Sequence, residues 1–144
     1  MNEFIQSRHL QRLAVVYVRQ SGGKQIRNNP ESTLRQLALR KRAEELGWPA
    51  ERILLLQDDQ GKSASSTRRR LAYRRLAELV IQDRVGIILA VDVSRWARDN
   101  AAWQLLLRDC IFAKVLLADE HKVYDPNDAH DKVLLGIQGG ARTI

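Results

Sequence analysis

The stretch LAVVYVRQSGGKQ, residues 13–25, begins as a buried β-strand and changes character toward its C-terminal end. Its apolar residues suit a protein core, but Tyr17, Arg19 and Ser21 alternate along the same segment. Alternate residues of an extended strand project from one face. The sequence therefore predicts a strand over 13–19 whose end carries a phenol, a guanidinium and a hydroxyl on a single face.

Strand and helix patterns alternate along the rest of the chain. Short apolar runs predict strands at 52–57, 86–93 and 114–119, followed by a short edge strand in the KVYD segment. Helical spacing and capping signals predict helices over about 29–47, 72–80 and 103–111, and from about 128 onward. This order indicates an α/β fold in three layers, with a mostly parallel sheet of four to five strands and helices on both faces.

The charge balance limits the class of partner. The chain has 24 Lys and Arg against 17 Asp and Glu, which gives a net charge of +7. Such a balance favours a polyanion, with nucleic acid ahead of a membrane surface. The stretch KSASSTRRRLAYRR, residues 62–75, contains six basic residues and no acidic one. A solvated basic face is the alternative interpretation of this stretch.

Nothing in the sequence predicts membrane insertion or secretion. The apolar run VGIILAV is too short to span a bilayer, and the N-terminus lacks the hydrophobic region of a signal peptide. The single cysteine, Cys110, cannot form an internal disulfide, and we expect it to be a small core residue. A cytoplasmic location is therefore expected.

Polar residues follow each predicted strand. In parallel α/β sheets, ligands bind outside the carboxyl ends of the strands, so these residues predict a site at that edge. They are Arg19, Gln20 and Ser21; Asp58, Asp59 and Gln60; Asp92, Ser94 and Arg95; and Asp119 and Glu120.

Several familiar kinds of site are disfavoured. None of the three histidines has a sequence context that points to Ser21, and the G-x-S-x-G pattern is absent, so a hydrolase triad is not expected. The SGGK segment lacks the spacing of a Walker loop. Asp58 and Asp59 have no second acidic cluster with metal-ligand spacing, so a capped strand end is favoured over a metal site.

Arginine is the residue type that suits this edge. Arg19 lies two residues before Ser21, and Arg95 and Arg98 are spaced to lie on one side of a helix. A guanidinium binds phosphate oxygens through two parallel hydrogen bonds. Several such groups around one hydroxyl suit attack on a phosphodiester, where negative charge spreads over the non-bridging oxygens. The alternative for Arg95 and Arg98 is a pair of surface charges.

An ordered set of motifs resembles the serine recombinases, the resolvase and invertase enzymes. The set comprises YVRQS at 17–21, Gln25, DQG at 59–61 with Ser63 after it, and SRWAR at 94–98. The segments HLQRLAVVYVRQS and VYDPND are similar to those of transposon- or phage-associated members. The resemblance extends from about residue 9 to 138.

The resemblance implies a resolvase-like fold and a reaction on DNA. Ser21 would attack a phosphodiester, form a 5′-phosphoserine link and release a 3′-hydroxyl. Strands would then be exchanged and rejoined within a tetramer, with no metal or other cofactor. The implied partners are DNA and further copies of the full-length protein, which would form dimers and tetramers.

Individual residues match the family pattern as follows. Arg19 matches the arginine beside the nucleophile, Arg95 and Arg98 match an R-x-x-R pair, and Gln25 matches a supporting glutamine. Arg70 best matches a catalytic loop arginine, with Arg68 and Arg69 as alternatives. Tyr17 is expected to be structural. The basic residues expected to bind DNA are Lys62, Arg68, Arg69, Arg74 and Arg75.

Two departures from the family pattern affect the expectations. Ser94 stands where many small resolvases have Asp, which leaves the acid role at that position in question. The resemblance also divides the chain into an N-terminal extension at 1–12, a catalytic domain at 13–138 and a truncated or artificial end at 139–144, without the long helix and DNA-binding domain. We expect this chain alone to fold but not to recombine DNA.

Two further interpretations remain. One is a truncated, non-catalytic fragment with at most weak, non-specific DNA binding. The other is an unrelated flavodoxin-like binding domain such as a signalling receiver, which leaves the arginines and the serine unexplained.

Overall fold

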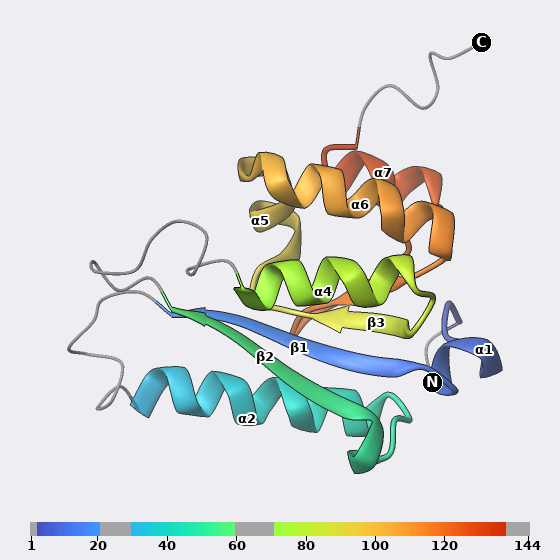
Figure 1. The fold of residues 1–144 in the computed structure, drawn as a ribbon. Coiled ribbons are helices and arrows are strands. Elements are labelled where there is room, and N and C mark those ends of the chain that lie inside the picture. The colour runs from blue at the N-terminus through green and yellow to red at the C-terminus, as the bar shows by residue number, and fades with distance from the viewer. Residues whose placement is uncertain (1–2, 21–29, 60–70, 138–144) are drawn as a thin grey trace, which may run out of the picture.

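The strands form one five-stranded sheet in a computed structural model that describes residues 3–20, 30–59 and 71–137 (Figure 1). The strand order is β2-β1-β3-β4-β5. β1 pairs in parallel with β2 and β3, β3 pairs in parallel with β4, and β4 pairs antiparallel with β5. The predicted mostly parallel sheet is therefore confirmed. The strands are β1 (Leu13–Gln20), β2 (Ile53–Asp59), β3 (Val85–Leu89), β4 (Leu116–Ala118) and β5 (Val123–Tyr124).

Helices cover both faces of this sheet. Figure 1 shows α2 on one face and α4, α5, α6 and α7 on the other, so the predicted three-layer α/β fold is confirmed. The short α1 lies beside the start of β1 (Figure 1). The helices are α1 (Ser7–Leu10), α2 (Pro30–Glu45), α4 (Leu71–Ile81), α5 (Val93–Asp99), α6 (Ala101–Ala113) and α7 (Ala129–Leu134), with a 3₁₀ helix η1 (Ala50–Arg52) before β2.

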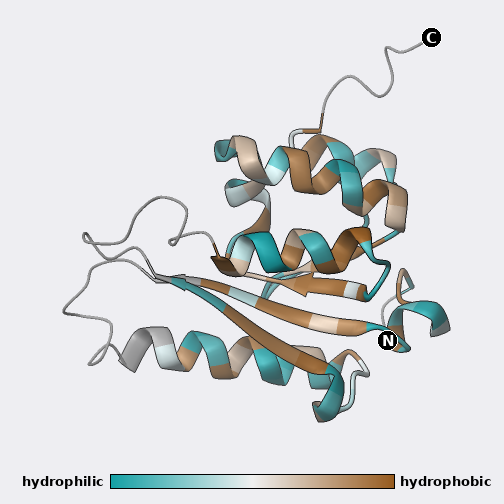
Figure 2. Cartoon of the chain, viewed as in Figure 1, coloured by the Kyte–Doolittle hydropathy of each residue, from teal (hydrophilic) through white to brown (hydrophobic). Residues whose placement is uncertain are grey.

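β1 supplies both halves of the core because its residues alternate between the two faces. Val15 and Tyr17 belong to the cluster beneath α4 and α6, whereas Val16 and Val18 belong to the cluster beneath α2. All five residues of β3 are buried as well. Most of β1 and β3 is accordingly coloured as hydrophobic in Figure 2, as expected for parallel strands covered on both faces.

The segment before β1 packs closely onto the sheet. The side chain of His9 is buried; its Nδ1 accepts a hydrogen bond from the backbone N–H of Gln6 at 2.9 Å, and its Nε2 donates to the carbonyl of Lys114 at 3.1 Å. Burial, assisted by the positive charge of Arg8, lowers the pKa of His9. A Cβ on Gly86 of β3 would lie 2.2 Å from the carbonyl oxygen of His9. Part of the predicted extension is thus packed against a central strand.

Three local features differ from the sequence expectations. The strand expected over 86–93 ends at Leu89, because Asp92 adopts a left-handed conformation with φ 48° and α5 begins at the next residue. The helix expected from about 128 ends at Leu134, shortly before Gly136 with φ 73°. α1 was not predicted, since four residues give too little periodicity.

Two smaller expectations concern Cys110 and membrane spans. Cys110 is fully buried in the core, which raises the pKa of its thiol, so its predicted role as a small core residue is confirmed. Across the described ranges, every helix is too short or too polar to cross a bilayer.

Candidate functional site

The sheet topology creates a crevice between β1 and β3. The chain goes from β1 to β2 on one side and later returns to add β3 on the other side. Ligands of doubly wound sheets bind at such a switch point, outside the carboxyl ends of the strands. A hollow of about 440 Å³ opens at this place. Tyr17 and Val18 of β1 form its base together with Ala90 and Val91, which follow β3.

The walls of this hollow come from helices on opposite faces of the sheet. Arg35 lines it from α2, and Arg95 and Trp96 line it from α5. Asp92 and Asp99, at the two ends of α5, also contribute to the lining. Both arginine side chains are exposed to solvent. The hollow thus presents two guanidinium groups on separate walls at the carboxyl end of β1.

Asp119 fixes the N-terminus of α5, the helix that carries Arg95. Its buried carboxylate accepts hydrogen bonds from the backbone N–H groups of Val93 at 3.2 Å, His121 at 2.9 Å and Lys122 at 2.9 Å. These bonds join the start of α5 to the turn between β4 and β5. Asp119, one of the predicted strand-end acids, therefore has a structural role that positions the arginine-bearing helix.

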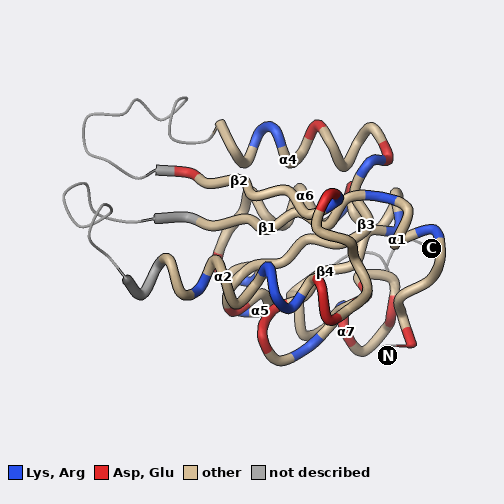
Figure 3. The backbone as a smooth tube through the Cα atoms, turned by 90° about the horizontal axis from the view of Figure 1, so that it is seen from below, with Lys and Arg blue, Asp and Glu red and all other residues tan. Residues whose placement is uncertain are grey.

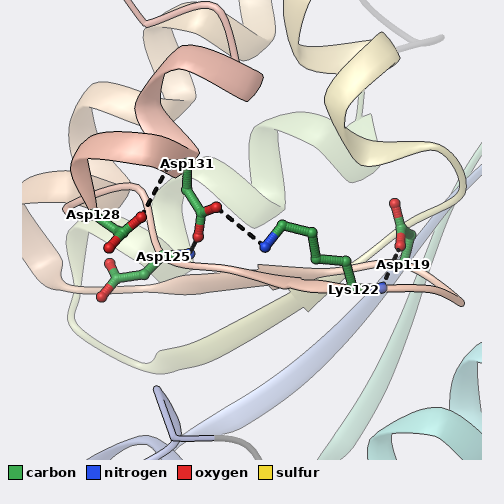
Figure 4. A network of polar contacts seen from close by, with 5 residues as sticks. All are labelled: Asp119, Lys122, Asp125, Asp128 and Asp131. Atoms are coloured by element: carbon green, nitrogen blue, oxygen red, sulfur yellow. Dashed lines mark hydrogen bonds and ion pairs between the residues drawn. The ribbon is translucent and has the colours of Figure 1, made fainter.

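The VYDPND segment forms a second polar network beside this one (Figure 4). The Asp128 carboxylate accepts from the backbone N–H of Asp131 at 3.0 Å and caps α7. The buried Asp131 carboxylate accepts from the N–H of Asp125 at 3.0 Å and forms an ion pair with Lys122 at 3.2 Å. Since these acids bind backbone groups and Lys122, the motif builds the connection from β5 to α7.

Asp58 and Tyr17 form the support beneath the hollow. The buried Asp58 carboxylate accepts hydrogen bonds from the Tyr17 hydroxyl at 2.5 Å and from the N–H groups of Ala72 at 2.7 Å and Tyr73 at 3.1 Å. Asp58 therefore caps the start of α4, as the sequence favoured over a metal role. The Tyr17 ring meets Trp96 edge-on, with centroids 6.0 Å apart. These contacts hold Tyr17 within the support of the hollow.

The structure separates Arg95 from Arg98. Both belong to α5, but Arg98 lines a second hollow of about 520 Å³ with Gln104 and Arg108 of α6 and with Gly136 and Ile137. The two arginines of the predicted pair therefore do not line one hollow. Ser94, which directly precedes Arg95, has its side chain hydrogen-bonded to Tyr124 of β5.

Of the other predicted site residues, the structure describes Arg74, Arg75 and the backbone of Arg19. Arg74 and Arg75 are exposed in the first two turns of α4, where Arg75 approaches Glu78 at 3.6 Å. In Figure 3 the blue segment of α4 lies near the start of that helix, beside the carboxyl end of β2. Arg19 pairs through its backbone with Asp58 in the β1–β2 register, but its side chain is not described. Outside the described residues lie Ser21, Gln25, Lys62, Arg68, Arg69 and Arg70.

Sequence reasoning did not identify Arg35 or Trp96 as parts of the site. α2 carries four basic residues along its length, and its pattern does not distinguish the one that lines the hollow. Its place directly after the first strand and the Gly-Gly segment was the available signal, because helices that follow a strand begin at the carboxyl edge of the sheet.

This geometry defines the class of the protein: it is a doubly wound α/β domain with arginines at the switch point of its sheet. The chain matches the family described as "Resolvase, N terminal domain" over residues 14–144. The chain therefore belongs to this family, and it is a serine recombinase N-terminal domain, as the resemblance implied.

Two known proteins illustrate the relationship. "Uncharacterized protein y4bA/y4pH" of Sinorhizobium fredii (strain NBRC 101917 / NGR234) is 44% identical over 131 residues, which are 91% of this chain but 19% of that protein. The crystal structure of a resolvase family site-specific recombinase from Streptococcus pneumoniae is similar with a TM-score of 0.59 and 22% identity, covering 87% of this chain and 84% of that one. The second similarity confirms the fold.

Proposed function

We propose that this domain cleaves and rejoins DNA as the catalytic domain of a site-specific serine recombinase. The observation that carries the proposal is the position of Arg95, which lines the switch-point hollow at the carboxyl end of β1, the strand that leads to Ser21. Membership of the resolvase family supports the same chemistry. The proposed ligand is a DNA phosphodiester, with the phosphorus atom within reach of the serine oxygen.

The proposed reaction is a reversible exchange of phosphate esters. The oxygen of Ser21 bonds to phosphorus, its proton is lost, the bond from phosphorus to the 3′-oxygen breaks, and the 3′-oxygen leaves as a hydroxyl after taking up a proton. The number of phosphate ester bonds is unchanged, so the reverse attack by a 3′-hydroxyl rejoins DNA without ATP.

Arginines have the proposed role of stabilising the phosphate as it is attacked. Arg95 donates two hydrogen bonds to non-bridging oxygens, where charge develops in the transition state. Arg19, Arg70 and Arg98 are proposed to assist, and Gln25 to support the site. The position of helix α5 is fixed before DNA binds, because the Asp119 carboxylate accepts a hydrogen bond from the N–H of Val93 at the start of the helix.

A suicide DNA substrate, which loses one fragment after cleavage, tests the proposal. The intact gene product should form a covalent protein–DNA adduct that survives a denaturing gel, and peptide mapping should locate the phosphate on Ser21. The adduct should form equally in EDTA, because guanidinium groups are proposed to neutralise the phosphate charge. Absence of an adduct, or its strict dependence on added magnesium, would count against this function.

Arg95→Lys should slow adduct formation more than tenfold. Lysine keeps the positive charge but loses the planar pair of donors, and loss of one preorganised donor typically costs about 2.7 to 4 kcal/mol in the transition state. Arg8→Lys is the matched control, since Arg8 is exposed on α1 at the other end of the strands (Figure 1). Equal rates for the two variants would return Arg95 to the role of a surface charge.

A further inference from the structure

We propose that Arg35 is a further DNA-contacting residue, which binds a backbone phosphate from the wall of the hollow opposite Arg95. This inference rests on the proposed function only in naming DNA as the ligand. Its basis is geometric: two arginines from different layers of the fold line the same hollow at the switch point of the sheet.

The convergence of these two residues is a consequence of the topology. α2 covers one face of the sheet and α5 lies on the other (Figure 1), yet residues of both helices line the same hollow. Arg35 and Arg95 are 60 positions apart in the chain, so local sequence does not bring them together. The buried Val18 and Ala90 line the same hollow.

Among the described residues, nothing occupies either guanidinium group. Within the described part of the chain, neither Arg35 nor Arg95 forms an ion pair or a hydrogen bond through its side chain. Both side chains are exposed to solvent. A guanidinium is protonated at all physiological pH values and donates in a planar fork that fits phosphate oxygens.

The two carboxylates of the lining weaken the attraction of the hollow for a free anion, and a polyanion can offset this by contacts elsewhere. Asp92 and Asp99 balance the formal charge of the two arginines, so the hollow has little net attraction for an isolated phosphate ion. A phosphate within DNA is also held by contacts elsewhere. The exposed Arg74 and Arg75 lie near the start of α4, which the Asp58 carboxylate holds at the end of β2, and we expect them to supply such contacts. The hollow therefore suits one phosphate of a DNA strand.

The competing interpretation is that Arg35 is an ordinary solvated charge on α2. Lys41 provides the matched comparison, because it is an exposed basic residue of the same helix that does not line the hollow. Arg35→Gln and Lys41→Gln each remove one positive charge from α2. A difference in DNA affinity between the two variants therefore reflects the position of the residue on α2, since the change in net charge is the same.

Trp96 makes the hollow observable by fluorescence. It lines the hollow, whereas the other two tryptophans, Trp48 and Trp103, are only 2% and 1% exposed. Titration of the 144-residue chain with a short DNA duplex should change the tryptophan emission. A Trp96→Phe variant should lose this change, and inorganic phosphate at the same phosphate concentration should not produce it.

The expected result is a selective loss in the Arg35 variant. Arg35→Gln should raise the Kd for the duplex about fivefold and lower the slope of log K against log salt by about 0.9, the value for one lost phosphate contact. Lys41→Gln should change the Kd less than twofold. The proposal is overturned by equal effects of the two variants, by a saturable response to inorganic phosphate, or by no response of Trp96 to DNA.

This experiment is separate from the test of the recombinase reaction, because it measures binding without cleavage. If Arg35→Gln selectively weakens binding in a protein that forms no adduct, the proposed DNA contact is supported and the proposed recombinase reaction is refuted. If the adduct forms but Arg35→Gln has no selective effect on binding, the proposed reaction is supported and the proposed DNA contact is refuted.

Discussion

Replacement of Ser21 by alanine should abolish the covalent protein–DNA adduct and leave DNA binding within about twofold of the wild type. The serine oxygen is the atom proposed to bond to phosphorus, and alanine has no nucleophile to replace it. The substitution removes no charge, and phosphate contacts by basic residues account for most non-specific affinity for DNA. Cleavage and binding should therefore respond to this change in different ways.

The measurement combines adduct formation on a suicide substrate with a binding titration of the same variant. Ser7→Ala is the matched control, because Ser7 is an exposed serine at the start of α1, at the other end of the strands. The control should form the adduct at the wild-type rate. An adduct that persists in Ser21→Ala would assign the nucleophile to another residue, while loss of both binding and cleavage would indicate a folding defect.

The fold was predictable because its central strands carry an unambiguous signal. A short, mainly apolar run predicts a strand covered on both faces, and both the start of Leu13–Gln20 and the whole of Val85–Leu89 meet that description. The helices follow from apolar spacing, as in α4, where the predicted Ala72, Leu76, Leu79 and Val80 are all buried. Local periodicity contains enough information for these elements.

The site was predictable only in part, since its walls meet through tertiary structure. Arg95 was found because it follows a strand directly, and the topology of parallel sheets places such residues at the ligand edge. Arg35 was not found, because its position against β1 depends on how α2 packs across the sheet. Arg95 and Arg98 are both exposed on α5, three residues apart as the spacing predicted, but Arg98 lines a different hollow with residues of α6 and residues 136–137.

Gly86→Ala should destabilise the domain by about 3 kcal/mol or more, at the upper end of what an added core methyl group usually costs. The new Cβ would lie 2.2 Å from the carbonyl oxygen, 2.9 Å from the carbonyl carbon and 3.0 Å from the Cα of His9. These are backbone atoms, so no side-chain rotation relieves the overlap. α1 must move away from β3, which breaks the hydrogen bond from the His9 ring to Lys114.

Chemical denaturation of the wild type and of two alanine variants measures the effect. Gly136→Ala is the comparison, because it adds the same methyl group where the nearest atom is the flexible Arg98 side chain, 2.6 Å away. Its cost should be about 1 to 2 kcal/mol, the penalty for a left-handed residue with a Cβ. Gly86→Ala should be the more destabilised of the two.

The comparison of the two glycine variants also decides whether the segment before β1 is an integral part of the domain. The family similarity begins at residue 14, although His9 is buried and Trp48 donates from Nε1 to the carbonyl of Arg12 at 3.0 Å. If α1 packs on β3 as described, a methyl group on Gly86 opposes that contact directly. A cost for Gly86→Ala no larger than that for Gly136→Ala would mean that α1 leaves the sheet easily and contributes little to stability. A clearly larger cost would place residues 5–12 within the folding unit.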